Sequence, residues 1–154
     1  MRRFSFFLPV AVFSIAWTAI SSAQTPPATA SRFGLGDYMT AFVQPRHMKL
    51  GLAGQARNWD YLAYERSELD ETFEMIEKQV PRYKGTAMAE LLKLVDGPME
   101  ELDKAIKARD GARFDAAYAR LTDGCNACHV TTEHKMVVIQ APKTSPFANQ
   151  KLDP

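Results

Sequence analysis

Residues 111–131 read GARFDAAYARLTDGCNACHVT, and their pattern determines the fold class of the chain. The apolar positions in this stretch recur every three or four residues, which is the spacing of one face of an α-helix. They are Phe114, Ala117, Tyr118, Leu121, Cys125 and Cys128. The stretch therefore predicts a helix whose core-facing stripe continues into the two cysteines of the chain.

Three stretches before it have the same spacing, and no stretch shows the convincing alternation of a β-strand. They predict helices over residues 35–56, 58–80 and 86–106. Four amphipathic helices joined by short turns predict an all-α fold, an antiparallel four-helix bundle over residues 34–134. The proline-containing residues 135–154 are expected to form an irregular tail.

Prolines predict where these helices bend or end, because proline has no backbone N–H to donate. Pro45 predicts a kink in the first helix, and Pro81 ends the second. Asp96-Gly97-Pro98 interrupts the third, which is therefore expected to be bent or split.

The first residues have the order of a secretory signal peptide. Two arginines precede an uncharged apolar run over residues 4–20, and Ser21-Ser22-Ala23 supplies small residues for cleavage. This order predicts a signal peptide over residues 1–23, a periplasmic mature protein and a flexible leader over residues 24–33. An uncleaved membrane anchor is the alternative, but the run contains Pro9 and several hydroxyl residues. After cleavage, no stable membrane anchor is expected.

Length and charge exclude several classes of protein. The 154 residues and 46% hydrophobic content suit one globular domain. The 19 basic and 18 acidic residues nearly balance, so no nucleic-acid surface is expected. No candidate nucleophile or acid–base pair stands out, and an enzyme is not predicted.

The segment Cys125-Asn126-Ala127-Cys128-His129 matches the signature of c-type haem attachment. Residues three and four apart share one face of a helix, so both thiols and the imidazole can project from one turn. The thiols can then bond to the two haem vinyl groups while His129 binds the iron. The motif predicts one covalent haem c, and Gly124 before it is expected to leave room for the macrocycle.

Three other interpretations of the cysteines compete with haem attachment. A thioredoxin-type dithiol would follow a strand and begin a helix, whereas this pair ends one. A zinc site could use Cys125, Cys128 and His134, but no second ligand pair follows at the usual spacing. A structural disulfide would leave His129 unexplained.

The ligand opposite His129 decides between electron transfer and gas binding. His134 is too close in sequence to reach the opposite face easily, which leaves His47 as the remote imidazole. Thioethers are supplied by Met39, Met48, Met75, Met88, Met99 and Met136. Most of these are expected to be core filler, because methionine packs into irregular gaps. Arg46 lies on the core face and needs a partner, either a haem propionate or a buried carboxylate.

The chain resembles the class II c-type cytochromes, the cytochrome c-prime and c556 group. The attachment motif near the C-terminus, the helices before it and Arg46-His47-Met48-Lys49 followed by Gly51 carry the resemblance. It covers most of residues 35–131, and it implies a four-helix bundle, Met48 as distal ligand and a possible homodimer through the first two helices. The histidine beside Met48 and the long tail depart from the family pattern.

These observations predict a single-electron carrier, with His129 and either His47 or Met48 as iron ligands and periplasmic redox proteins as partners. The alternative is a five-coordinate haem protein that binds nitric oxide or carbon monoxide. A third possibility is a helical binding module without haem, whose cysteines form a disulfide.

Overall fold

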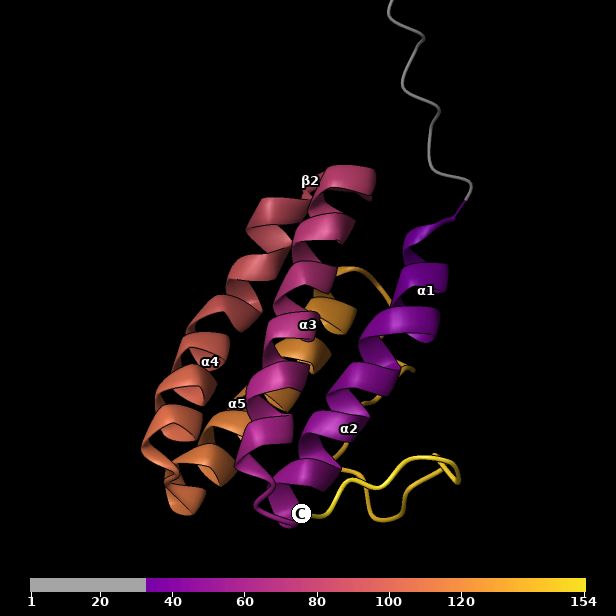
Figure 1. The fold of residues 1–154 in the computed structure, drawn as a ribbon. Coiled ribbons are helices and arrows are strands. Elements are labelled where there is room, and N and C mark those ends of the chain that lie inside the picture. Colours follow the sequence, from indigo (N-terminus) through magenta and orange to yellow (C-terminus); the bar gives the residue numbers. More distant parts are fainter. Residues whose placement is uncertain (1–32) are drawn as a thin grey trace, which may run out of the picture.

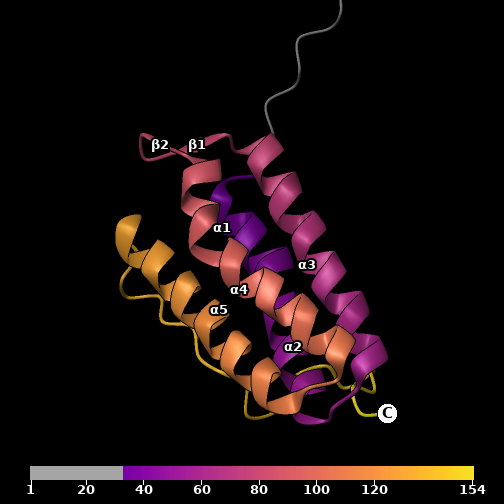
Figure 2. The same ribbon diagram turned by 90° about the vertical axis from the view of Figure 1, so that its left-hand side faces the viewer.

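The computed structural model describes residues 33–154, and this part of the chain is mostly helical, which confirms the predicted all-α class. The long helices are α2 (Gln44–Gln55), α3 (Trp59–Gln79), α4 (Met88–Ala108) and α5 (Gly111–Thr131). They lie side by side, and successive helices run in opposite directions (Figures 1 and 2). The predicted signal peptide and all but the last residue of the predicted leader lie outside the described residues.

Among the described residues, the search for a membrane-crossing helix finds none with the required length and apolar character.

The first helical segment widens just before Pro45 instead of breaking there. It consists of α1 (Leu35–Tyr38), the π-helix η1 (Met39–Val43) and α2. Because Pro45 cannot donate to the carbonyl four residues earlier, a wider turn precedes it, and Gln44 N–H donates to Met39 O. The extra residue in this turn changes which side chains face inward. Phe42, in this turn, is 39% exposed.

Helix α3 has the predicted position. The side chain of Asn58 accepts a hydrogen bond of 3.2 Å from the backbone N–H of Tyr61, which caps the first turn. The helix ends at Gln79, two residues before Pro81.

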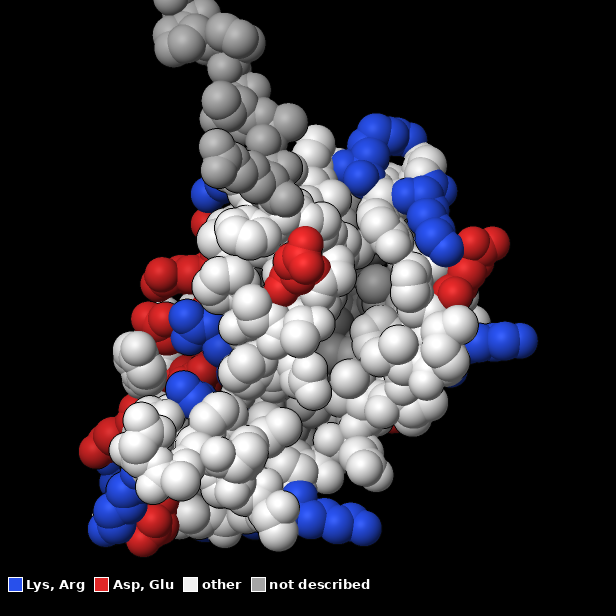
Figure 3. Space-filling model, turned by 90° about the vertical axis from the view of Figure 1, so that its right-hand side faces the viewer, with Lys and Arg blue, Asp and Glu red and all other residues white. Residues whose placement is uncertain are grey.

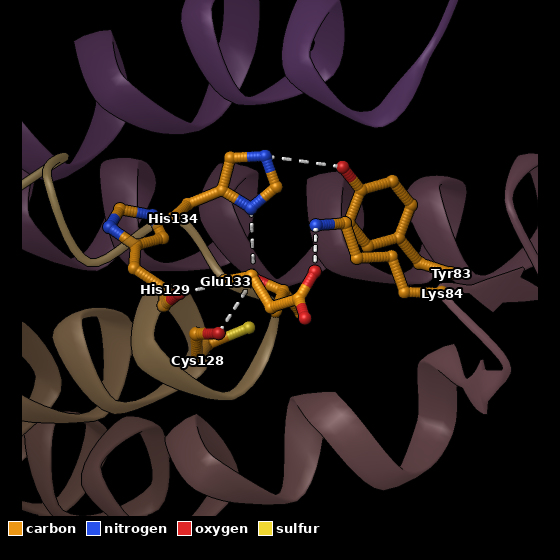
Figure 4. Close-up of polar contacts among 7 residues, drawn as sticks. Tyr83, Lys84, Cys128, His129, Glu133 and His134 are labelled. Atoms are coloured by element: carbon orange, nitrogen blue, oxygen red, sulfur yellow. Dashed lines mark hydrogen bonds and ion pairs between the residues drawn. The ribbon is translucent and has the colours of Figure 1, made fainter.

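A short hairpin joins α3 to α4, although no strand was expected. Strand β1 (Arg82–Tyr83) pairs antiparallel with β2 (Thr86–Ala87), and Lys84 and Gly85 in the turn have positive φ angles. Two-residue strands are too short to produce an alternating pattern, so the sequence carried no periodic signal for them. The hairpin places Tyr83 beside the end of α5 (Figure 4).

The expectation that the third helix is split at Asp96-Gly97-Pro98 is wrong, because α4 is continuous and contains Pro98. Two features permit this. Gly97 has no Cβ to collide with the proline ring that follows it. The carbonyl of Leu94, to which Pro98 cannot donate, lies against Gly124 of α5, where a Cβ would be only 2.4 Å from its oxygen.

Gly124 therefore serves the packing of α5 on α4. We expect Gly124→Ala to lower the free energy of unfolding of the haem-free protein by about 1–3 kcal/mol, because the added methyl meets backbone that cannot rotate away. Urea denaturation followed by circular dichroism measures this change. Gly36→Ala is the matched control, since its methyl meets nothing within 4 Å. Equal midpoints for the two variants would contradict the packing role.

Residues after α5 form no helix or strand, but they are held against the other elements. Gln55 donates to Pro142 O over 2.8 Å, and Asn58 donates to Leu152 O over 3.1 Å. The side chain of Leu152 is buried. The chain end thus returns to the turn between α2 and α3 (Figure 1).

Candidate functional site

A cavity of about 230 Å³ lies between the first helical segment and α5. A cavity that holds a single water molecule has a volume of roughly 10–15 Å³, so this cavity has room for a far larger group. Its walls contain no Lys, Arg, Asp or Glu, and most of them are apolar. The face of the molecule that carries the first segment is hollowed, with mostly uncharged side chains around the hollow (Figure 3).

Both cysteines line this cavity as free, half-buried thiols. Burial raises the pKa of Cys125 to about 12, and it also raises the pKa of Cys128. Disulfide oxidoreductases instead need a thiol whose pKa is lowered. The environment of the two thiols therefore argues against the dithiol interpretation.

His129 lies in the wall of the same cavity, and one of its ring nitrogens is already used. Its Nδ1 is 2.7 Å from the carbonyl oxygen of Val137. A carbonyl can only accept, so Nδ1 carries the proton and Nε2 keeps its lone pair. This is the tautomer that a metal-ligating histidine needs.

A second imidazole, that of His134, also lines the cavity. Its Nε2 lies 3.4 Å from the hydroxyl of Tyr83, and the two rings are 5.9 Å apart (Figure 4). Lys84 and Glu133 form an ion pair of 2.7 Å beside them. These contacts join the hairpin to the end of α5. In residues 33–154, no group of three or more His, Cys, Asp or Glu side chains could hold a metal ion.

His47 reaches the cavity wall, but both of its ring nitrogens have protein partners. Nε2 lies 3.0 Å from Thr122 Oγ1. Nδ1 lies 3.1 Å from the hydroxyl of Tyr118, whose ring stacks on the imidazole. In this arrangement His47 joins α2 to α5.

Burial lowers the pKa of His47 from 6.5 to about 4. His47 therefore binds its proton at a higher pH in the unfolded chain than in the folded one. Protonation favours the unfolded chain, so the free energy of unfolding decreases as pH falls from 6.5 to 4. We expect a loss of about 3 kcal/mol over that range in the haem-free protein. The measurement is the urea midpoint against pH for the wild type and for His47→Gln, and the difference between the two curves isolates the histidine. Parallel curves would contradict the expectation.

Arg46 has two carboxylate partners and does not line the cavity. Its guanidinium lies 2.7 Å from Glu68 and 3.5 Å from Glu65 of α3. The side chain of Glu65 is 1% exposed, and burial raises the pKa of its carboxyl. Of the two partners that the sequence suggested for Arg46, the buried carboxylate is thus present. Pairing with a haem propionate stays a prediction.

The two methionines of the first helical segment differ in their position relative to the cavity. Met39, in η1, is half-buried and lines the cavity, whereas Met48 does not line it. The sequence offered Met39 as one of six thioether candidates, but the ligand predicted from it was His47 or Met48.

The cavity walls also include tail residues that sequence reasoning did not select, Val137 and Ile139. They belong to the run Met136-Val137-Val138-Ile139, which is unusually apolar for a tail. This run was the one feature of the sequence that could have indicated a tail segment packed against the fold. No protein-family model, curated protein or solved structure matches the chain.

The donor set fits a covalently bound haem. It comprises two neutral thiols, an imidazole with a free Nε2 and a thioether from a different element, around an uncharged cavity. Apolar walls suit the faces of a macrocycle, and thioether and imidazole are both common haem ligands.

Proposed function

We propose that the chain is a periplasmic c-type cytochrome that carries single electrons. It would be an antiparallel four-helix bundle with one haem c attached to α5 through Cys125 and Cys128. The observation that carries this proposal is that both thiols and the correctly protonated His129 meet in one uncharged cavity.

His129 would be the proximal ligand, held by the carbonyl of Val137. For the distal position, the geometry favours Met39, because it lines the cavity and a methionine sulfur is an established haem ligand. His47 would first have to give up its hydrogen bond to Thr122. Met48 would have to move into a cavity that it does not line.

When bound, haem supplies an iron that changes between the ferric and ferrous states. The residues of this chain would hold it and exclude water: Leu91, Leu92 and Val95 of α4 and Val43 of η1 form apolar walls. A site with fixed walls and no water rearranges little when the charge on its bound group changes. Such a site suits transfer to other periplasmic redox proteins better than chemistry on a substrate.

A five-coordinate protein that binds nitric oxide or carbon monoxide is the second candidate. The observation in its favour is that the first segment contributes the apolar residues Leu35 and Val43 to the cavity wall as well as Met39. Such a wall would hold a small apolar gas if Met39 stayed off the iron.

The test is expression with the native N-terminus in a host that matures c-type cytochromes. We expect a mature mass equal to the cleaved polypeptide plus one haem, and a low-spin absorption spectrum in both oxidation states. A high-spin spectrum would favour the gas-binding candidate. A mass equal to that of the polypeptide alone would refute both.

A further inference from the structure

The segment that follows α5 folds back along the end of that helix. We call residues 134–139 the return segment. The backbone N–H of His134 donates to His129 O over 2.6 Å, and Val137 N–H donates to His134 O over 2.8 Å. Glu133, with φ 63°, makes the reversal. The return segment thereby brings Val137 O to His129 Nδ1 and places Val137 and Ile139 in the cavity wall.

Asn126 holds the far end of the return segment with both groups of its side-chain amide. Its Nδ2 donates to Ile139 O over 2.9 Å, and its Oδ1 accepts from Ile139 N–H over 2.8 Å. The amide thus bonds to Ile139 as a neighbouring β-strand would. Asn126 and His129 are three residues apart on α5, so they face the same segment.

The two contacts share one short piece of chain. Only one residue separates Val137, which accepts from the imidazole, from Ile139, which Asn126 holds. Without Asn126, the return segment keeps its contacts near His134 but loses its anchor at Ile139. Val137, which is itself 47% exposed, then has little to fix the direction of its carbonyl.

We infer that Asn126 is a positioning residue for the candidate iron ligand. By fixing Ile139, Asn126 keeps Val137 O within hydrogen-bond distance of Nδ1 of His129. This hydrogen bond keeps the proton on Nδ1, leaves Nε2 unprotonated and fixes the orientation of the ring. This inference rests on the proposed function for its meaning. The motif itself requires only the two cysteines and the histidine, so this use of the intervening position belongs to this chain.

The test compares Asn126→Ala with Asn149→Ala. Asn149 is an exposed asparagine of the same tail for which the structure gives no side-chain hydrogen bond. Ile139→Pro is a second disruption outside the motif, since it removes the N–H that donates to Asn126. The first measurement is ¹⁵N NMR of His129 in the haem-free protein at pH 8, which reports the nitrogen that carries the proton.

In the wild type and in Asn149→Ala we expect the Nδ1–H form to dominate. In Asn126→Ala and Ile139→Pro we expect a mixture with a substantial Nε2–H fraction. In Asn126→Ala we also expect faster hydrogen exchange at the Ile139 amide, which has lost its acceptor. In the haem-loaded protein, loss of the hydrogen bond weakens electron donation by the imidazole, so the reduction potential should rise in both variants and not in the control.

A purely structural asparagine would lower thermal stability and leave the tautomer and the potential unchanged, and that result would overturn the inference. If no haem is attached in any variant, the proposed function fails instead. The NMR comparison still decides the role of Asn126 in that case, because it needs no haem.

Discussion

Replacement of both Cys125 and Cys128 by alanine is expected to abolish covalent haem attachment completely. These are the only two cysteines of the chain, and both line the cavity that His129 shares. Intact-mass spectrometry of the exported protein should then give the mass of the bare mature polypeptide. Haem staining of the denatured protein on a gel should also be lost.

The matched control is Thr131→Ala. Thr131 is exposed on the next turn of α5, and its hydroxyl donates only to Ala127 O. This variant should keep the full mass of the loaded protein. Both proteins should show similar helix content by circular dichroism if the loss is chemical. Haem that remains covalently bound in the cysteine-free variant would refute the assignment of the motif.

Met39→Leu is expected to convert a low-spin, six-coordinate protein into a high-spin one. Leucine fills a similar volume, so the fold should be retained at a cost below about 1.5 kcal/mol. It has no sulfur to bind iron, so the sixth position becomes free. The ferrous variant should bind carbon monoxide rapidly, whereas the wild type should not. The measurements are absorption spectra with and without the gas.

Met48→Leu and His47→Gln serve as comparisons, since these positions were the two candidates from sequence. Met48→Leu should leave the spectrum unchanged, because Met48 does not line the cavity. His47→Gln should reduce stability and leave the spin state alone. A spectrum altered in His47→Gln and unaltered in Met39→Leu would reverse the distal assignment.

The sequence predicted best what depends on neighbours along the chain. Helical spacing was enough to place Cys125, Cys128 and His129 on one turn, because the geometry of a single turn hardly depends on the rest of the fold. The apolar period also predicted α3 and α5 to within a few residues. Local rules were sufficient in both cases.

The sequence predicted less well what depends on contacts between elements. Helical counting could not show that Pro45 would widen the preceding turn, or that a cavity would form that Met39 lines and Met48 does not. The partners of His47 come from positions more than 70 residues away on α5. Glu65 reads as a surface residue until Arg46 is placed beside it. The tail residues that line the cavity lie outside helices and strands, so no periodic pattern in the sequence could predict their position.

The position of the return segment has a consequence for the order of assembly. Val137 and Ile139 follow the two cysteines in the chain, so they are synthesised after them. In a chain exported from its N-terminus, as proposed, the thiols would emerge before Val137 and Ile139 could dock beside them. Ligation would thus act on an open site, and docking of the last residues would come afterwards as the closing step of maturation.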